Sequence, residues 1–168
     1  MKGLKHGLGV EKINSSIIYV GNFRNNVKDG IGVILDIKNG KKVIFEGFWS
    51  NGQKTGYCKD YTDSRKEYEG MVIQGIKHGL GRLKFYDQNR LISTFFGQFE
   101  QDLQNGIGHL ETDSYIYIGE FLRGKKHGKG YMKYKPGSNL DSYFGQFSEN
   151  YQTGYGIQRD KEGYQFEG

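Results

Sequence analysis

The stretch YIGEFLRGKKHGKG at residues 117–130 carries both of the short motifs that decide the fold. It opens with an aromatic-x-glycine motif that ends at Gly119, and it closes with a glycine-x-glycine motif that begins nine residues later, at Gly128. Between the two motifs lies Gly124, four residues before Gly128. A tight hairpin turn needs residues that tolerate a positive φ, which glycine adopts most easily. The stretch therefore predicts a strand, a tight turn and a second strand.

The same two motifs recur along the chain at a fixed distance from each other. The aromatic-x-glycine motif ends at Gly21, Gly47, Gly70, Gly97, Gly119, Gly145 and Gly168. The glycine-x-glycine motif begins at Gly7, Gly30, Gly79, Gly106, Gly128 and Gly154, and a copy at Gly56 has Cys58 in place of its second glycine. The turn position holds only glycine, asparagine or aspartate: Gly3, Asn26, Gly52, Gly75, Asp102, Gly124 and Asn150. Because six successive pairs keep the nine-residue separation, we interpret the chain as tandem β-hairpins.

The composition favours a thin β-structure with many turns. Glycine accounts for 27 of the 168 residues, more than twice the usual share of about 7%, and alanine is absent. Both features would penalise a helical domain. We therefore predict an all-β fold: a single-layer, twisted, antiparallel β-meander that is elongated and has no substantial helix. It would form one array over residues 1–168, with six complete units and an orphan half-repeat at each end, at 1–18 and 157–168.

An aromatic-x-glycine motif, a glycine five residues later and then His-Gly-x-Gly resemble the MORN (membrane occupation and recognition nexus) repeat. The copies most similar to that pattern are 68–81 and 117–130. The resemblance covers the whole chain and implies an array of non-catalytic hairpin repeats. The histidine of the pattern is replaced in four units, by Asp29, Thr55, Asn105 and Thr153.

A longer period overlies the single repeat. Gly21, Gly70, Gly119 and Gly168 are each 49 residues apart, because every second connection between units is about three residues longer. Two explanations stay open. The period is inherited from an ancestral duplication, or the long loops along one edge meet a partner that itself repeats.

Catalytic and metal-binding patterns are not visible in the sequence. Three of the four histidines, at His6, His78 and His127, occupy one repeat position on different hairpins, where we expect them to position the turn. That distribution lacks the spacing of metal ligands. Cys58 is a single thiol without a nearby histidine to activate it. We expect no enzyme, no cofactor and no metal.

Charge and cysteine content restrict the partners and the compartment. The net charge of +5 is dispersed along the chain, which is not the basic patch of a nucleic-acid-binding protein. A single cysteine excludes an internal disulfide, and no charged-then-apolar leader precedes the repeats. We therefore expect an intracellular protein that does not bind nucleic acid.

Two faces of the predicted sheet are candidates for binding protein. The central residues of the glycine-x-glycine motifs point away from the glycine face, and six of the seven are apolar or aromatic: Leu8, Ile31, Tyr57, Leu80, Ile107 and Tyr155. We expect them to form an exposed stripe that marks a contact, unless neighbouring lysine and glutamine stems shield it. The rings on the other face are expected to be mostly core with a rim that can take a helix or peptide: Phe23, Trp49, Phe99, Phe121 and Phe147.

The orphan half-repeats place unpaired strands at both edges of the sheet. The first half contains Gly7 and Gly9, and the last half contains Phe166 and Gly168. Unpaired edges invite another strand. Either the sequence is a fragment of a longer chain, or neighbours complete its ends, for example a second copy that joins head to tail through these four residues.

The resemblance implies a structural role. Such arrays are similar to subunits of ciliary and flagellar axonemes, such as the radial spoke head, and of parasite cytoskeletal rings. Lysine outnumbers arginine by 18 to 6, a bias typical of the AT-rich genomes that are common among protists, many of them ciliated. We expect a scaffold in the cytoplasm that belongs to the cytoskeleton, most specifically to the axoneme, with other proteins of a large complex as partners.

A membrane-apposed module that binds anionic lipid is the alternative. Family members such as junctophilins and plant phosphatidylinositol phosphate kinases are linked to lipid. Lys125 and Lys126 are the candidate lipid contacts, although stable attraction usually takes a cluster of about four to eight basic residues. An enzymatic role would require a catalytic domain elsewhere in a larger chain, as in the SET-domain lysine methyltransferase that carries MORN repeats.

Overall fold

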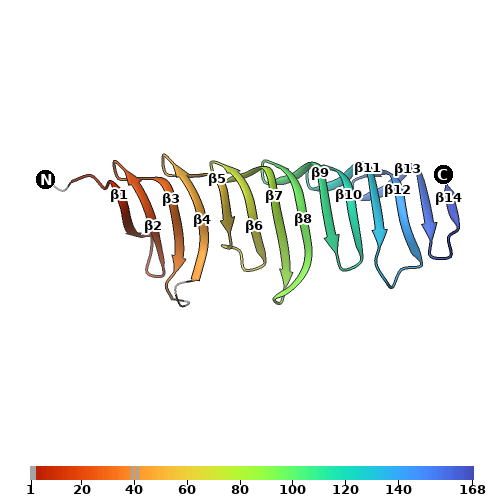
Figure 1. The fold of residues 1–168 in the computed structure, drawn as a ribbon, viewed down its shortest axis with the longest axis horizontal. Coiled ribbons are helices and arrows are strands. Elements are labelled where there is room, and N and C mark those ends of the chain that lie inside the picture. Colours follow the sequence, from red (N-terminus) through yellow and green to blue (C-terminus); the bar gives the residue numbers. More distant parts are fainter. Residues whose placement is uncertain (1–2, 39, 41) are drawn as a thin grey trace.

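The computed structural model describes residues 3–38, 40 and 42–168, and its strands follow one another in a single antiparallel sheet. Figure 1 shows an elongated ribbon of one layer, with the two ends of the chain at opposite ends of the ribbon. The strands are β1 (Gly7–Lys12), β2 (Ile17–Arg24), β3 (Val27–Asp36), β4 (Lys42–Ser50), β5 (Gln53–Asp60), β6 (Lys66–Ile73), β7 (Ile76–Asp87), β8 (Arg90–Glu100), β9 (Leu103–Thr112), β10 (Tyr115–Leu122), β11 (Lys125–Tyr134), β12 (Leu140–Ser148), β13 (Tyr151–Asp160) and β14 (Gln165–Glu167). No helix occurs in these described ranges, so the predicted single-layer β-meander is confirmed.

The tight turns lie along one edge of the ribbon and the connections between units lie along the other (Figure 1). In the β4–β5 turn both central residues have positive φ, 48° for Asn51 and 80° for Gly52. That combination is the type I′ hairpin turn, whose twist matches the twist of the strands it joins. Six of the seven turn positions predicted from sequence have positive φ and are confirmed, whereas Gly3 precedes β1, has no positive φ and forms no hairpin turn. At the first central position the chain also accepts long side chains with positive φ, at Gln74, Gln101, Arg123 and Glu149.

The two glycines of a glycine-x-glycine motif have different structural roles, one in backbone conformation and one in packing. The first, Gly128 in β11, has a φ of +57°, and the pairing of β10 with β11 shifts there by one β-bulge. The second, Gly130, pairs with Gly119 of β10 and lies under the ring of Tyr117. A Cβ on Gly130 would lie 2.4 Å from Tyr117 Cε2, so no larger residue fits without displacing the ring.

This arrangement repeats across the sheet as a continuous row of paired glycines. Each member is paired with the next strand's member, in the order Gly9, Gly21, Gly32, Gly47, Cys58, Gly70, Gly81, Gly97, Gly108, Gly119, Gly130, Gly145 and Gly156. Within this row, Cys58 is the one residue with a side chain. The aromatic rings lie over the row and form the core.

The core rings contact one another edge to face. Along the face that carries the glycine row, ring centroids are separated by 4.9 Å between Tyr117 and Phe147 and by up to 5.5 Å between Phe45 and Trp49. Aromatic pairs favour this geometry because the positive edge of one ring meets the negative face of the next. The tyrosine hydroxyls also find partners. Tyr117 Oη, for example, donates to the carbonyl of Glu120 at 2.9 Å.

Substituting Gly130 by alanine tests the role of the glycine row. We expect the Gly130→Ala protein to be less stable by about 1–3 kcal/mol, the usual cost of adding an atom to a filled core. The midpoint of urea unfolding measures the effect. Gly3→Ala is the matched control, because nothing lies within 4 Å of a Cβ there and its φ is not in the left-handed region. Equal midpoints for the two variants would contradict a ring seated on the glycine.

Substituting Cys58 tests the interruption of the row. Burial raises the pKa of the Cys58 thiol from 9.0 to about 11. Because the folded state holds this proton more tightly than the unfolded state, its contribution to stability is complete below pH 9 and is lost as the pH rises towards 11. Unfolding measured between pH 8 and pH 11 should show a larger fall in stability for the wild type than for Cys58→Gly. Parallel curves for the two proteins would contradict this burial.

Candidate functional site

The predicted apolar residues at the centre of the glycine-x-glycine motifs lie on the face opposite the rings, and all of them are exposed. Their exposed fractions range from 47% for Tyr57 to 78% for Leu8 and Tyr155. We call these residues the apolar stripe: Leu8, Ile31, Tyr57, Leu80, Ile107 and Tyr155. From Leu8 to Ile107 successive members are two strands apart, which corresponds to roughly 9.6 Å, whereas Ile107 and Tyr155 are four strands apart. The stripe therefore runs along the ribbon, with Lys129 at the same position in β11.

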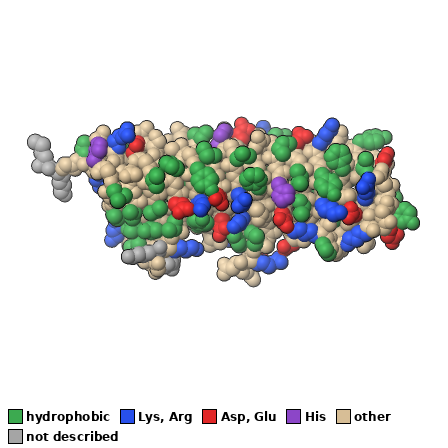
Figure 2. Space-filling view, viewed as in Figure 1, with side chains coloured by type: hydrophobic (Ala, Val, Ile, Leu, Met, Phe, Trp, Pro, Cys, Tyr) green, Lys and Arg blue, Asp and Glu red, His purple; other side chains and the backbone are tan. Residues whose placement is uncertain are grey.

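The apolar stripe is wider than the sequence analysis predicted. Exposed apolar side chains flank it on the neighbouring strands: Phe48, Met71, Phe96, Ile118, Tyr131 and Phe144. Phe48 pairs with Ile31, and Met71 pairs with Tyr57, so the two sets are interleaved. Two sequence positions could have revealed these exposed side chains. Phe48, Met71 and Tyr131 each follow a motif glycine, and Phe96, Ile118 and Phe144 are the central residues of aromatic-x-glycine motifs. Figure 2 shows hydrophobic side chains along the whole visible face, mixed with charged ones.

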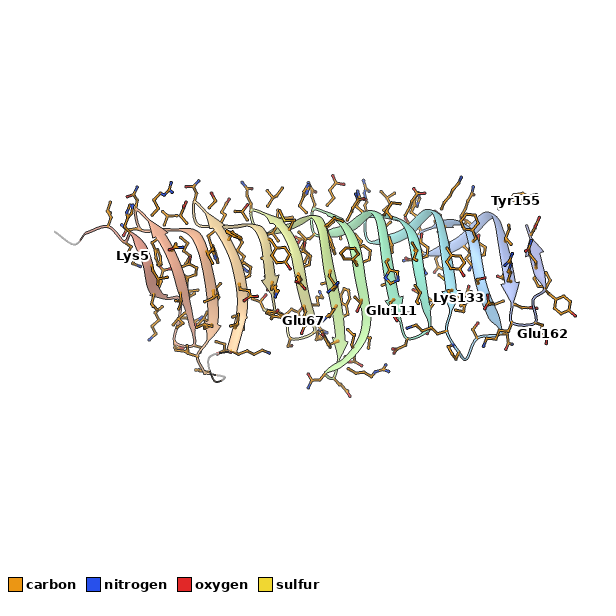
Figure 3. The ribbon with its side chains drawn as sticks, viewed as in Figure 1. Lys5, Glu67, Glu111, Lys133, Tyr155 and Glu162 are labelled. Carbon is orange, nitrogen blue, oxygen red and sulfur yellow. The ribbon has the colours of Figure 1, made fainter. Side chains whose placement is uncertain are left out.

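One hollow lies on the stripe near the C-terminal end. It encloses about 320 Å³, and its apolar lining comes from Phe144, Tyr155 and Ile157. Lys129, Gln146 and Glu167 complete its lining with polar groups. Tyr155 is labelled in Figure 3 and projects from the end of the ribbon near this hollow. An apolar hollow with few polar groups is the usual form of a binding site.

The rings on the other face are buried rather than displayed. Phe23, Trp49, Phe99, Phe121 and Phe147 all belong to the core. A row of lysines covers rings of this face, at the position two residues before five of the seven copies of the glycine-x-glycine motif; Gln104 and Gln152 hold that position in the other two. We call this the lysine row: Lys5, Lys28, Lys54, Lys77 and Lys126. This row was not predicted, although the position recurs at a fixed distance from the motif.

Carboxylates neutralise most of the lysine row. Glu11 accepts from Lys28 at 2.7 Å and from Lys5 at 2.9 Å, and these hydrogen bonds lower the pKa of its carboxyl group. Asp60 lies 3.1 Å from Lys54, and Asp102 lies 3.2 Å from Lys77. Four of the five lysines therefore form ion pairs above the aromatic rings.

The two lysines proposed as lipid contacts lie in different surroundings. Lys126 is 7% exposed and lies over the rings of Tyr115 and Phe147, where desolvation lowers the pKa of its ammonium group. Lys125 forms an ion pair with Glu149. The pair is therefore not a patch of free positive charge on one surface.

The motif histidine position connects neighbouring turns. His6 Nδ1 accepts a hydrogen bond from the backbone N–H of Asn25 at 3.4 Å. Asp29 and Asn105 occupy the same position in their units and accept in the same way from the next tight turn, also at 3.4 Å. This geometry explains why an aspartate or asparagine replaces the histidine. In the described residues no group of three or more histidine, cysteine, aspartate or glutamate side chains can hold a metal ion.

The four residues proposed for an end-to-end contact lie in the outermost strands. Gly7 and Gly9 lie in β1, which pairs with β2 on one side. Phe166 lies in β14 and is exposed, and Gly168 exchanges two backbone hydrogen bonds with Gly156 of β13. In the part of the chain that the structure describes, no helix is long and apolar enough to cross a membrane.

Comparison with known proteins agrees with this architecture. Alsin from Rattus norvegicus, Homo sapiens and Mus musculus is 31% identical to this chain over 114 residues. The aligned region covers 64% of this chain and spans 7% of the length of these relatives. The family model of the MORN repeat matches residues 1–15, 19–42, 45–59, 68–90, 95–112, 117–139 and 143–163. MORN repeats are a non-enzymatic module for contacts with proteins or membranes, and this chain belongs to the MORN-repeat family.

Proposed function

We propose that this chain is a scaffold that binds other proteins of a large cytoskeletal assembly, with the ciliary or flagellar axoneme as its location. The observation that carries the proposal is the apolar stripe, which lies exposed on a sheet that has no second layer. Large exposed apolar patches on soluble proteins usually mark interaction sites. Support for the axoneme comes from the resemblance to axonemal arrays and from the excess of lysine over arginine.

The shape of the sheet supports a scaffold. Fourteen strands at roughly 4.8 Å each give a ribbon on the order of 65 Å long. Every strand pairs only with its neighbours in sequence, so the distance between two contacts is set by the number of repeats between them. Such a ribbon holds several partners, or several copies of one partner, at defined spacings.

Charged substitutions in the apolar stripe test the proposal. In the triple variant Ile31→Lys, Leu80→Lys, Ile107→Lys, the fold should be kept, because exposed substitutions usually change stability by less than about 0.5 kcal/mol each. We expect a tagged wild-type chain in its native cell to stay with the detergent-resistant cytoskeleton together with axonemal proteins. We expect the triple variant to be released.

A matched control uses polar residues of the same face. Glu46 and Lys59 form an ion pair at 3.4 Å, and replacing both with glutamine should leave retention unchanged. Retention of the triple variant at the wild-type level would reject the stripe as the binding surface. Release of the wild-type chain by detergent, with membrane proteins as its partners, would reject the cytoskeletal role.

Pelleting with vesicles that contain anionic lipid tests the membrane alternative. Because Lys125 is paired with Glu149 and Lys126 is buried, we expect no salt-sensitive pelleting at an ionic strength of about 0.15 M. Lys125→Ala should behave like the wild type. Pelleting that is lost in high salt and reduced by Lys125→Ala would favour the membrane module over the scaffold.

A further inference from the structure

The edge-to-face contacts between core rings are interrupted at one place in the described chain. One series of contacting rings runs through Phe23, Tyr19, Trp49 and Phe45. A second series runs through Tyr68, Phe99, Phe95, Phe121, Tyr117, Phe147 and Tyr143. Between them stands Val72, which occupies the position that holds a phenylalanine or tryptophan in the other five complete units. The stack therefore lacks one ring, between Phe45 and Tyr68.

A cavity of about 180 Å³ lies at this interruption. Its floor consists of the buried side chains Tyr68, Val72 and Leu83. Asp60, the last residue of β5, and Thr62 in the loop that follows contribute to its rim. An apolar cavity of about 150 Å³ accepts a benzene molecule, so this space is large enough for one aromatic ring.

The cation nearest to the interruption has moved to one side of it. Lys54 Nζ lies 3.8 Å from the ring centroid of Phe45, whereas the equivalent Lys28 and Lys77 lie 5.1 Å and 5.3 Å from their rings. Asp60 holds Lys54 there. The ion pair thus covers Phe45, and the cavity lies on the Tyr68 side of the gap, with Lys77 in its lining.

The charges around the cavity are balanced. Its two carboxylates, Asp60 and Asp63, each have a lysine partner, Lys54 at 3.1 Å and Lys66 at 3.7 Å. The remaining lysine of the lining, Lys77, pairs with Asp102. A neutral occupant with an apolar body and a polar tip fits this combination of apolar floor and polar rim, which describes the side chains of tyrosine and tryptophan.

A second hollow lies next to the cavity, towards the edge that carries the inter-unit connections. It encloses about 350 Å³, shares Asp63 and Lys66 with the first, and is lined further by Glu67 and Tyr86. Glu67, labelled in Figure 3, lies on β6 towards that edge of the ribbon.

We propose that the cavity at Val72, here called the ring socket, binds a tyrosine or tryptophan side chain of a partner protein, which takes the place of the missing ring beside Tyr68. This inference rests on the proposed function, because it requires a protein partner. It adds a second contact on the face opposite the apolar stripe.

Methyl NMR of the intact chain tests the ring socket directly. The probes are N-acetyl-tyrosinamide and N-acetyl-tryptophanamide at millimolar concentration, and N-acetyl-leucinamide is the control. We expect the aromatic amides to shift the methyl signals of Val72 and Leu83 in a saturable manner, because a bound ring lies against both. The leucine amide should not produce these shifts. Absence of saturable shifts with either aromatic amide would overturn the proposal.

Val72→Phe supplies the missing ring from within the chain. We expect this variant to keep the amide spectrum of β10 to β13 and to bind the aromatic probes roughly tenfold more weakly or worse, followed at Leu83. Val10→Phe places the same side chain at an exposed position of the other face and should leave binding unchanged. If Val72→Phe does not fold, Val72→Leu is the replacement variant. Leucine fills only part of the cavity, so we expect a smaller loss of affinity for the aromatic probes. Unchanged affinity in the variant that folds would refute the socket.

Experiments can reject the ring socket and the proposed scaffold function separately. Val72 lies on the ring face and the apolar stripe lies on the other, so the triple stripe variant should bind the aromatic probes as the wild type does. Loss of the probe signal in wild-type protein, with cytoskeletal retention intact, would reject the socket alone. A normal probe signal in a chain that is not retained by the cytoskeleton would reject the proposed scaffold.

Discussion

The whole structure depends on the contact between an aromatic ring and two glycines of adjacent strands. Tyr117 illustrates it, because its ring lies over both Gly119 and Gly130, and a Cβ on either glycine would overlap the ring. The contact hides backbone that glycine leaves bare, and it brings each ring close enough to meet the next one edge to face. A single sheet thereby acquires a core from its own side chains. It needs no second layer to exclude water from that core.

This solution has a consequence for the other face. A sheet usually buries one face against a second layer and leaves the other to solvent. Here the aromatic rings and the lysine row already cover the backbone of the ring face, so this face needs no second layer. Both faces therefore contact solvent and are accessible to partners. The exposed residues Ile31 and Phe48 do not belong to the core. Apolar side chains at such positions are better explained by contacts with another molecule.

The fold was predictable because its rules are local. Turn residues, motif glycines and the alternation of side chains along a strand each depend on a few neighbouring residues. The surfaces were less predictable. Lys126 was a candidate lipid contact beside Lys125, but strand alternation places it over Tyr115 and Phe147, among the rings. The lysine row and the cavity at Val72 depend on how long side chains and a loop pack over the sheet, which motif spacing does not determine.

A regular array can present a distinct binding site only at a unit that deviates from the repeat. Identical units present identical surfaces, so a partner would bind each of them with the same affinity. The unit that begins at Tyr68 differs from its neighbours in two adjoining ways: Cys58 interrupts the glycine row just before it, and Val72 interrupts the ring stack within it. Both changes remove a feature that the other units use for packing, and the second leaves a ring-sized space in the core face. A partner that inserts a ring there is held at one defined point along the ribbon, while the apolar stripe can provide the larger contact area. The ring face would then set the position of the partner along the ribbon, and the face with the apolar stripe would set the strength of its attachment.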